Sequence, residues 1–222
     1  MENIGENMNK VVIFDWGGVI LKEYPEHYCD RDAIKETMKK FNSDLTNDEA
    51  YQLYLDTLKD ENGNIISIFN DYDNKYKWYE RVKKNGNLSA SYEEFISEFI
   101  NNYVKIDKYE EVVDYIYSLK DRVPLALFSD LIFVCFKSLE NHINLDVFDN
   151  VFLSYEEGFV KSNIEAFENV ESKLNLDGRN ILFIDNNENN ISNAKKCGWN
   201  TCLAYGYEIE KIKKCVEEFL NK

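Results

Sequence analysis

The stretch that most constrains the fold of this chain is Val11 to Ile20, which reads VVIFDWGGVI. Four β-prone apolar residues lead directly into Asp15, and a pair of glycines follows one residue later. An apolar run without polar alternation is typical of a strand buried on both faces of a parallel sheet. Because open α/β sheets bind ligands beyond the carboxyl ends of their strands, Asp15 is a candidate nucleophile or metal ligand. On this stretch alone, a polar residue that merely ends a strand is an equally good interpretation.

Composition sets outer limits on size and partners. With 222 residues, 44% of them hydrophobic, the chain can build one sizeable core and a smaller subdomain. Its net charge of −15 argues against nucleic acids and acidic membranes as partners, and no apolar run approaches the length of a membrane span. The five cysteines form no C-x-x-C pair, so we expect reduced thiols and a cytoplasmic location.

The part of the chain after the first strand has the pattern of helices. Thr46–Glu49 and Ser91–Glu94 match the capping box that starts a helix. Turn signals at Asn62–Asn64 and Asn85–Asn87 separate the helical segments. We therefore predict a helical subdomain over residues 22–104, inserted between the first strand and the rest of the sheet.

One segment of this subdomain is crowded with aromatic and basic residues. Tyr72, Tyr76, Trp78 and Tyr79 lie within DYDNKYKWYERVKK. They could line a substrate pocket, but aromatic side chains in a small helical bundle more often form its core.

The second half of the chain alternates between strand and helix patterns. Helix-length segments separate the strands, so we predict an α/β fold with a parallel sheet and helices on both faces. Right-handed crossovers then bring the carboxyl ends of all strands to one edge. The predicted strands are Val123–Asp130, Asn150–Tyr155, Ile181–Asp185 and Asn200–Tyr205, and the predicted helices are Lys108–Lys120, Ile164–Leu174, Glu188–Cys197 and Ile209–Phe219.

Three polar residues follow or end strands at this edge, namely Asp15, Ser129 and Asp185. Two converging carboxylates repel each other unless a cation lies between them, and few oxygen ligands point to magnesium. We expect the carboxylates of Asp15 and Asp185 within ~6 Å of each other, close enough to share that ion. Such a site suits phosphoryl transfer, in which Asp15 attacks phosphorus while Ser129 and Lys161 hold phosphoryl oxygens.

These residues resemble the haloacid dehalogenase (HAD) superfamily of hydrolases over essentially the whole chain. The matching motifs are FDWGGVI, LFSD, Lys161 within EGFVKSNIEAF, and FIDNNENN. The resemblance implies a Rossmann-like core over residues 9–21 and 105–222, with an α-helical (C1) cap over residues 22–104. The D-x-G-[GN]-V form of the first motif is similar to a subgroup that includes bacterial sugar-phosphate phosphatases.

The resemblance also implies roles for individual residues. Asp15 matches the nucleophile, Ser129 the phosphate-binding hydroxyl and Lys161 the phosphate-neutralising lysine. Magnesium is the implied cofactor. Its implied ligands are Asp15, Asp185 and the Gly17 carbonyl, with Asn186 and Asn190 as auxiliary positions and with Trp16, Gly17 and Asp130 as further phosphate-binding positions.

Four positions depart from the family pattern. Gly17 stands where most phosphatases of the family carry a second Asp, which contributes roughly 10²–10⁴ in rate as a general acid and base. His27 is one candidate replacement, although a lone histidine is more often incidental. Asn186 replaces an acidic residue at the metal site, Asp130 stands where Asn is usual, and Ser162 where Pro is usual.

We therefore favour a magnesium-dependent phosphatase that acts on a small phosphorylated metabolite through an aspartyl-phosphate intermediate. The alternative is a catalytically weak or inactive relative that binds a phosphorylated ligand or a protein partner. A dehalogenase is a third interpretation, because halide release needs no proton, but the small Gly17 and the acidic Asp130 argue against it.

Overall fold

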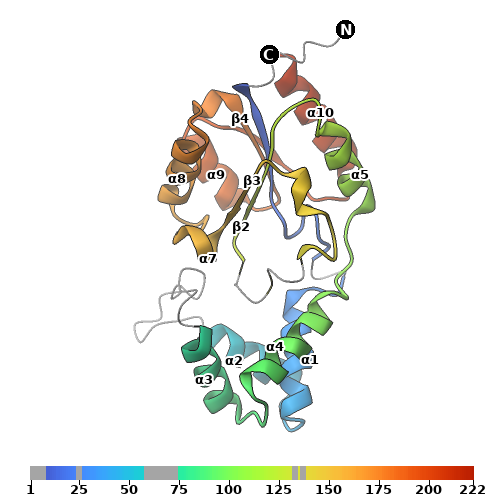
Figure 1. The fold of residues 1–222 in the computed structure, drawn as a ribbon, viewed down its shortest axis with the longest axis vertical. Helices are drawn as coiled ribbons and strands as arrows, with labels where there is room; N and C mark the ends of the chain where they lie inside the picture. The colour runs from blue at the N-terminus through green and yellow to red at the C-terminus, as the bar shows by residue number, and fades with distance from the viewer. Residues whose placement is uncertain (1–8, 24–26, 58–74, 132–134, 136–138) are drawn as a thin grey trace.

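The computed structural model describes residues 9–23, 27–57, 75–131, 135 and 139–222. The turn predicted at Asn62–Asn64, Tyr72 and the side chain of Tyr76 lie outside the described residues. Figure 1 shows a central sheet flanked by helices on two sides, with a second group of helices beyond one end of the sheet.

The sheet has five parallel strands in the order β3-β2-β1-β4-β5, which confirms the predicted fold class. The first strand lies at its centre, as its unbroken apolar pattern predicts. The predicted second strand is too long at its start, because Pro124 has no N–H to donate to a neighbouring strand. The strands are β1 (Val11–Phe14), β2 (Leu125–Ser129), β3 (Asn150–Leu153), β4 (Ile181–Asp185) and β5 (Asn200–Leu203).

Helices cover both faces of this sheet (Figure 1). Val11 and Ile13 of β1 pack in a cluster with residues of α8 and α9, whereas Val12 and Phe14 pack in a cluster with residues of α5 and α10. Successive side chains of a strand point to opposite faces, so a run of four apolar residues supplies both layers. These elements are α5 (Glu110–Leu119), α7 (Ser154–Glu157), α8 (Ile164–Leu174), α9 (Glu188–Lys196) and α10 (Ile209–Leu220), with short 3₁₀ turns η4 (Leu145–Val147) and η5 (Gly178–Asn180).

Four further helices gather beyond the carboxyl ends of the strands (Figure 1). Both predicted capping boxes are present, with Glu49 accepting the N–H of Thr46 and Glu94 accepting the N–H of Ser91. Trp78 is buried and packs on Phe95, which favours the core interpretation for this part of the aromatic segment. The helices are α1 (Asp30–Phe41), α2 (Asn47–Thr57), α3 (Lys75–Gly86) and α4 (Tyr92–Tyr103).

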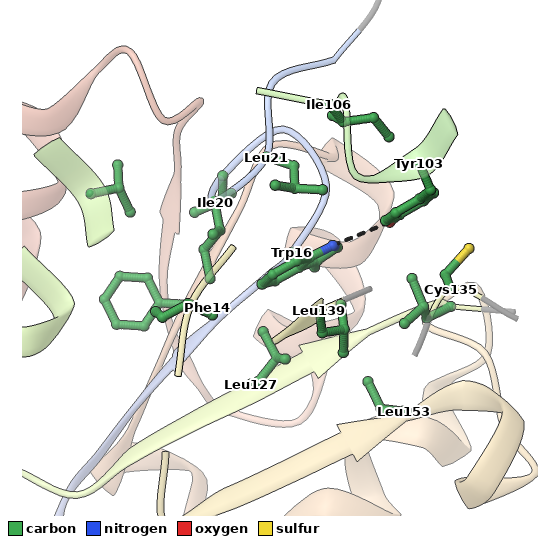
Figure 2. Packing of buried hydrophobic residues seen from close by; sticks show 14 of the residues in the cluster. Phe14, Trp16, Ile20, Leu21, Tyr103, Ile106, Leu127, Cys135, Leu139 and Leu153 are labelled. Carbon is green, nitrogen blue, oxygen red and sulfur yellow. Dashed lines mark hydrogen bonds between the residues drawn. The ribbon is translucent and has the colours of Figure 1, made fainter. Parts of the chain in front are cut away.

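One buried hydrogen bond links this helical group to the segment that follows β1. Trp16, the residue after Asp15, donates its indole N–H to the hydroxyl of Tyr103 at the end of α4, at 3.2 Å. Figure 2 shows the two side chains among buried apolar residues that include Leu127 and Leu139. The sheet and the helical group therefore share one hydrophobic cluster.

Across the part of the chain that the structure describes, no helix is long and apolar enough to cross a membrane. All five cysteines, Cys29, Cys135, Cys197, Cys202 and Cys215, are free thiols, as their spacing predicts.

The Trp16–Tyr103 contact can be tested by stability. Replacing Tyr103 with Phe leaves the buried indole N–H of Trp16 without its acceptor, so we expect unfolding to become easier by about 1–3 kcal/mol. Urea denaturation measures this change. The matched control is Tyr207→Phe at a side chain that is 66% exposed, which should change stability by less than about 0.5 kcal/mol. Equal effects of the two substitutions would show that the hydrogen bond contributes nothing.

Candidate active site

The site begins where two neighbouring strands end side by side. Asp15 follows β1 directly, and its N–H donates to the carbonyl of Ile184 on β4 at 2.9 Å. This hydrogen bond sets Asp15 level with Asp185, the last residue of β4. Both side chains are buried, with 6% of Asp15 and none of Asp185 exposed. The parallel register has therefore brought two carboxyl groups together below the surface.

The ammonium of Lys161 lies between these two carboxylates. Its Nζ is 2.5 Å from Oδ1 of Asp15 and 2.9 Å from Oδ2 of Asp185. The two carboxylate oxygens are thus at most about 5.4 Å apart, the sum of those distances, which meets the sequence expectation of ~6 Å. Lys161 is itself only 2% exposed, so all three charges are held away from water.

Lys161 is positioned through its backbone as well as its side chain. The Asp130 carboxylate accepts the N–H of Lys161, at 2.9 and 3.2 Å to its two oxygens. From α9, the side-chain amide of Asn193 donates to the carbonyls of Lys161 and Ser162, both at 3.1 Å. These contacts fix the loop before α8, which lets a long flexible side chain present its charge at one place.

The two aspartates differ in how many of their carboxylate oxygens accept hydrogen bonds. In Asp185, Oδ1 accepts the N–H of Asn187 at 2.7 Å, and Oδ2 accepts from Asn190 at 3.0 Å as well as from Lys161. In Asp15, Oδ1 accepts the N–H of Trp16 at 2.7 Å in addition to Lys161. Among the described residues, none donates to Oδ2 of Asp15. This oxygen is therefore free to act on a ligand.

Burial and neighbouring charges shift the pKa values of Asp15 and Lys161. Burial raises the pKa of Asp15 well above its usual value, the charge of Asp185 raises it further, and Lys161 opposes both. Burial alone would lower the pKa of Lys161, but the two carboxylates outweigh it and the pKa is raised. The ammonium therefore stays charged, whereas the charge on Asp15 is held at a cost in free energy.

A cavity of about 80 Å³ is lined by Trp16 and Gly17, the two residues that follow Asp15, and by Tyr103 of α4, whereas Asp15 itself is not among the lining residues. Ser129 ends β2 and lines this cavity together with Gly17 and Asp130, so the structure gathers these three predicted site residues at one place. Trp16 also borders it, but its indole packs into the hydrophobic cluster (Figure 2) and its backbone N–H donates to Asp15. The side chain of Trp16 thus has a structural role in addition to the phosphate-binding role predicted for this position.

Glu23 also lines the cavity, and sequence reasoning missed it. A tight turn, in which the N–H groups of Ile20 and Leu21 both donate to the Trp16 carbonyl, folds the chain back after the glycines. The Glu23 carboxylate then accepts from the side-chain amide of Asn186 at 3.2 Å. Burial raises the pKa of Glu23, as does the nearby Asp30.

Other predicted residues lie in less expected places. His27 is exposed, lies against the ring of Tyr109 and is not among the residues that line the cavity. Asn186 points its amide to Glu23, whereas Asn190 contacts Asp185. Of the two positions predicted as auxiliary to the metal, Asn190 is therefore the one in contact with a predicted metal ligand.

The site fits a hard cation with few protein ligands. Within the described residues, no group of three or more His, Cys, Asp or Glu side chains has a metal-holding arrangement. Magnesium usually keeps several waters and needs only one or two carboxylates, unlike structural zinc. The unpartnered Oδ2 of Asp15, the buried Asp185 and the carbonyl predicted at Gly17 are the hard oxygen donors that this ion prefers.

Comparison with known proteins agrees with this arrangement. A family model described as haloacid dehalogenase-like hydrolase matches residues 9–198. No curated protein sequence matches the chain. A parallel five-stranded sheet with a buried aspartate–lysine–aspartate group defines a Rossmann-like α/β protein with its site at the carboxyl edge. The chain belongs to the haloacid dehalogenase-like hydrolase family.

Solved structures share the fold at low sequence identity. A HAD family enzyme from Bacteroides thetaiotaomicron is 19% identical with a TM-score of 0.70, over 87% of this chain and 92% of that one. The same enzyme in complex with magnesium and inorganic phosphate gives a TM-score of 0.59 at 18% identity, over 86% and 92%. The L-2-haloacid dehalogenase from Xanthobacter autotrophicus, with chloropropionic acid covalently bound, gives 0.55 at 13% identity, over 87% and 76%.

The raised pKa of Asp15 predicts how its removal affects stability. Because the folded state binds a proton at Asp15 more tightly than the unfolded state, its contribution is full at low pH and is lost as the pH rises above 3.8 through the raised pKa. Asp15→Asn should therefore be more stable than the natural protein in metal-free buffer at neutral pH, and this advantage should shrink in acid.

Urea unfolding between pH 4 and pH 8 measures this difference. Asp121→Asn, which removes one charge from an exposed turn, controls for the change in net charge. A lower denaturation midpoint for Asp15→Asn than for the natural protein at neutral pH would contradict the interpretation.

Proposed function

We propose that the chain is a magnesium-dependent phosphatase that hydrolyses a small phosphorylated metabolite through a phosphorylated Asp15. The observation that carries this proposal is the asymmetry of the Asp15 carboxylate. One oxygen is held by Lys161 and by the N–H of Trp16, while the other has no donor among the described residues. A carboxylate fixed at one oxygen and free at the other is oriented for nucleophilic attack.

The neighbouring side chains supply charge and orientation. Lys161 carries the positive charge that offsets the charge on the phosphoryl oxygens, and its backbone anchors at Asp130 and Asn193 hold it in place. The Ser129 hydroxyl, at the end of β2, hydrogen-bonds a phosphoryl oxygen. The free oxygen of Asp15 attacks phosphorus, and water later cleaves the resulting acyl phosphate and restores the carboxylate.

Asp15, Asp185 and the Gly17 carbonyl are the residues that would hold magnesium. The ion neutralises charge on the phosphoryl group and orients it when it is bound. Support for this cofactor comes by analogy, since the Bacteroides thetaiotaomicron enzyme has been crystallised with magnesium and inorganic phosphate. Support from this chain is the convergence of two buried carboxylates at adjacent strand ends.

Residues 22–104 act as a cap over the core formed by residues 9–21 and 105–222. The placement of α1–α4 beyond the carboxyl ends of the strands supports this division (Figure 1). A cap in this position covers the leaving group and selects the substrate, and the D-x-G-[GN]-V motif resembles that of a subgroup that includes bacterial sugar-phosphate phosphatases. Free thiols at all five cysteines support a cytoplasmic location.

The direct test is a panel of phosphorylated metabolites, assayed with magnesium and with chelator. We expect at least one ester to be hydrolysed, and chelator to abolish its turnover. Asp15→Asn keeps the size of the side chain but removes the attacking charge, so turnover should fall to background while the protein stays folded. Near-normal turnover by Asp15→Asn would exclude Asp15 as the nucleophile. Failure of the natural protein to hydrolyse any ester would favour the binding-only alternative.

A second prediction concerns the metal. Asn186 lacks the charge that the family usually places there, so we expect turnover to need an unusually high magnesium concentration. Asn186→Asp adds an anionic oxygen next to Asp185 and should lower the magnesium concentration that gives half-maximal rate. Asn189→Asp, which adds the same charge at the second residue of α9, is the matched control. No difference between the two variants would place Asn186 outside the influence of the metal.

A further inference from the structure

The reaction needs a proton donor, and three acidic side chains of the described residues line the cavity, those of Glu23, Asp30 and Asp130. An alcohol leaves phosphorus easily only when its oxygen is protonated as the bond breaks. Titratable side chains that line the cavity are mostly committed to other partners. Lys22 pairs with Asp107, Cys29 contacts Asp32, Asp30 accepts the N–H of Arg31, and Asp130 accepts the N–H of Lys161.

Within the described part of the chain, Glu23, like Asp30 and Asp130, accepts only from a neutral donor, and it differs from them in where its second oxygen lies. Its carboxylate forms no ion pair with a described residue, and its hydrogen-bond donor is the neutral amide of Asn186 on Oε2. The other oxygen, Oε1, points over the backbone of Gly17, which is two residues from Asp15. A carboxyl group with one oxygen held by a neutral amide and one oxygen free can exchange a proton with a ligand.

The position of that free oxygen is specific. An ideal Cβ built on Gly17 would lie 2.4 Å from Oε1 of Glu23. In an aspartate, bond lengths and angles place the carboxylate oxygens roughly 2.4 Å from the residue's own Cβ. The Glu23 oxygen is therefore at the distance that an aspartate oxygen at position 17 would have, although it arrives from a different part of the chain.

We propose that Glu23 is a catalytic residue, the general acid and base of the phosphatase reaction inferred above, on which this inference rests. As the Asp15 oxygen bonds to phosphorus, the bond from phosphorus to the leaving oxygen breaks, and that oxygen takes its electron pair and the proton of Glu23. The Glu23 carboxylate next removes a proton from water as the water oxygen bonds to phosphorus. The bond to Asp15 then breaks, its electron pair returns to the carboxylate, and Glu23 is protonated again.

The test compares two esters that differ in their need for a proton. Phenyl phosphate has a poor leaving group, whereas 2,4-dinitrophenyl phosphate has one that departs without protonation. Glu23→Gln keeps the size and the hydrogen bond to Asn186 but carries no exchangeable acid proton. We expect kcat/KM for phenyl phosphate to fall by about 10²–10⁴, and that for the dinitrophenyl ester by less than about tenfold. Glu111→Gln, which removes one charge from an exposed position in α5, should leave both values unchanged.

A second experiment moves the carboxylate from position 23 to position 17. In Gly17→Asp, the new Cβ would meet Oε1 of Glu23 at 2.4 Å, so the two carboxylates compete for one space. Glu23→Ala removes that conflict. We expect Gly17→Asp/Glu23→Ala to recover most of the phenyl phosphate activity that Glu23→Ala loses, with thermal melting confirming that both variants are folded.

The competing explanation is that the charge of Glu23 strengthens magnesium binding. Measuring the magnesium affinity separates this role from that of a general acid and base. As a general acid and base, Glu23 should leave the magnesium affinity of the protein, measured by calorimetry, within about twofold of the natural value in Glu23→Gln. Equal losses on both esters together with weaker magnesium binding would overturn the proposal. Unchanged kinetics in Glu23→Gln would also overturn it while leaving the phosphatase function intact. A natural protein that hydrolyses neither ester would instead remove the proposed function.

Discussion

The bridge from Lys161 to Asp15 and Asp185 is the interaction on which the rest of the site depends. The parallel pairing of β1 with β4 forces two carboxylates into the same buried space, and in a low dielectric they repel strongly. One ammonium offsets this repulsion, and removing Lys161 would leave both carboxylates buried without a compensating charge, which typically costs about 3–5 kcal/mol. The anchors of Lys161 at Asp130 and Asn193 follow from that need, because the compensating charge must be kept in place.

The three buried charges of Asp15, Lys161 and Asp185 lower the stability of the folded protein, and a function would explain why they are present. Three buried charges with one excess negative charge are a poor way to stabilise a core, since apolar residues of similar size would often serve better. The site nevertheless lies in well-packed surroundings. The ring centroids of Phe128 and Phe183 are each 5.7 Å from Nζ of Lys161. Trp16 then links the nucleophile segment to the helical group through Tyr103. The fold thus holds a strained electrostatic arrangement rigidly.

Much of this arrangement could be predicted from the sequence, because it depends on strand ends. Unbroken apolar runs that stop at Asp15, Ser129 and Asp185 place those residues at one edge of any parallel sheet. The capping boxes could also be predicted, because a capping box depends only on two residues that lie three positions apart in the sequence.

Glu23 and Asn193 could not be predicted, because their roles depend on contacts that no local pattern encodes. Glu23 reaches the site only because the turn after the glycines returns the chain over Gly17. Asn193 is one of several asparagines in α9, and only the packing of that helix shows that it holds the Lys161 loop. For the same reason, sequence reasoning turned to His27, a nearby residue in the chain whose side chain lies elsewhere.

The central claim, that Asp15 forms a covalent bond to phosphorus, is tested most directly by trapping the intermediate. The protein is mixed with a hydrolysable phosphate ester and magnesium, quenched in acid within milliseconds, treated with hydroxylamine and digested for mass spectrometry. The claim predicts that Asp15 is converted to its hydroxamate in the peptide that contains VVIFDWGGVI, and only when ester is present. Continued turnover with an unmodified Asp15, or with the hydroxamate on another residue, would contradict it.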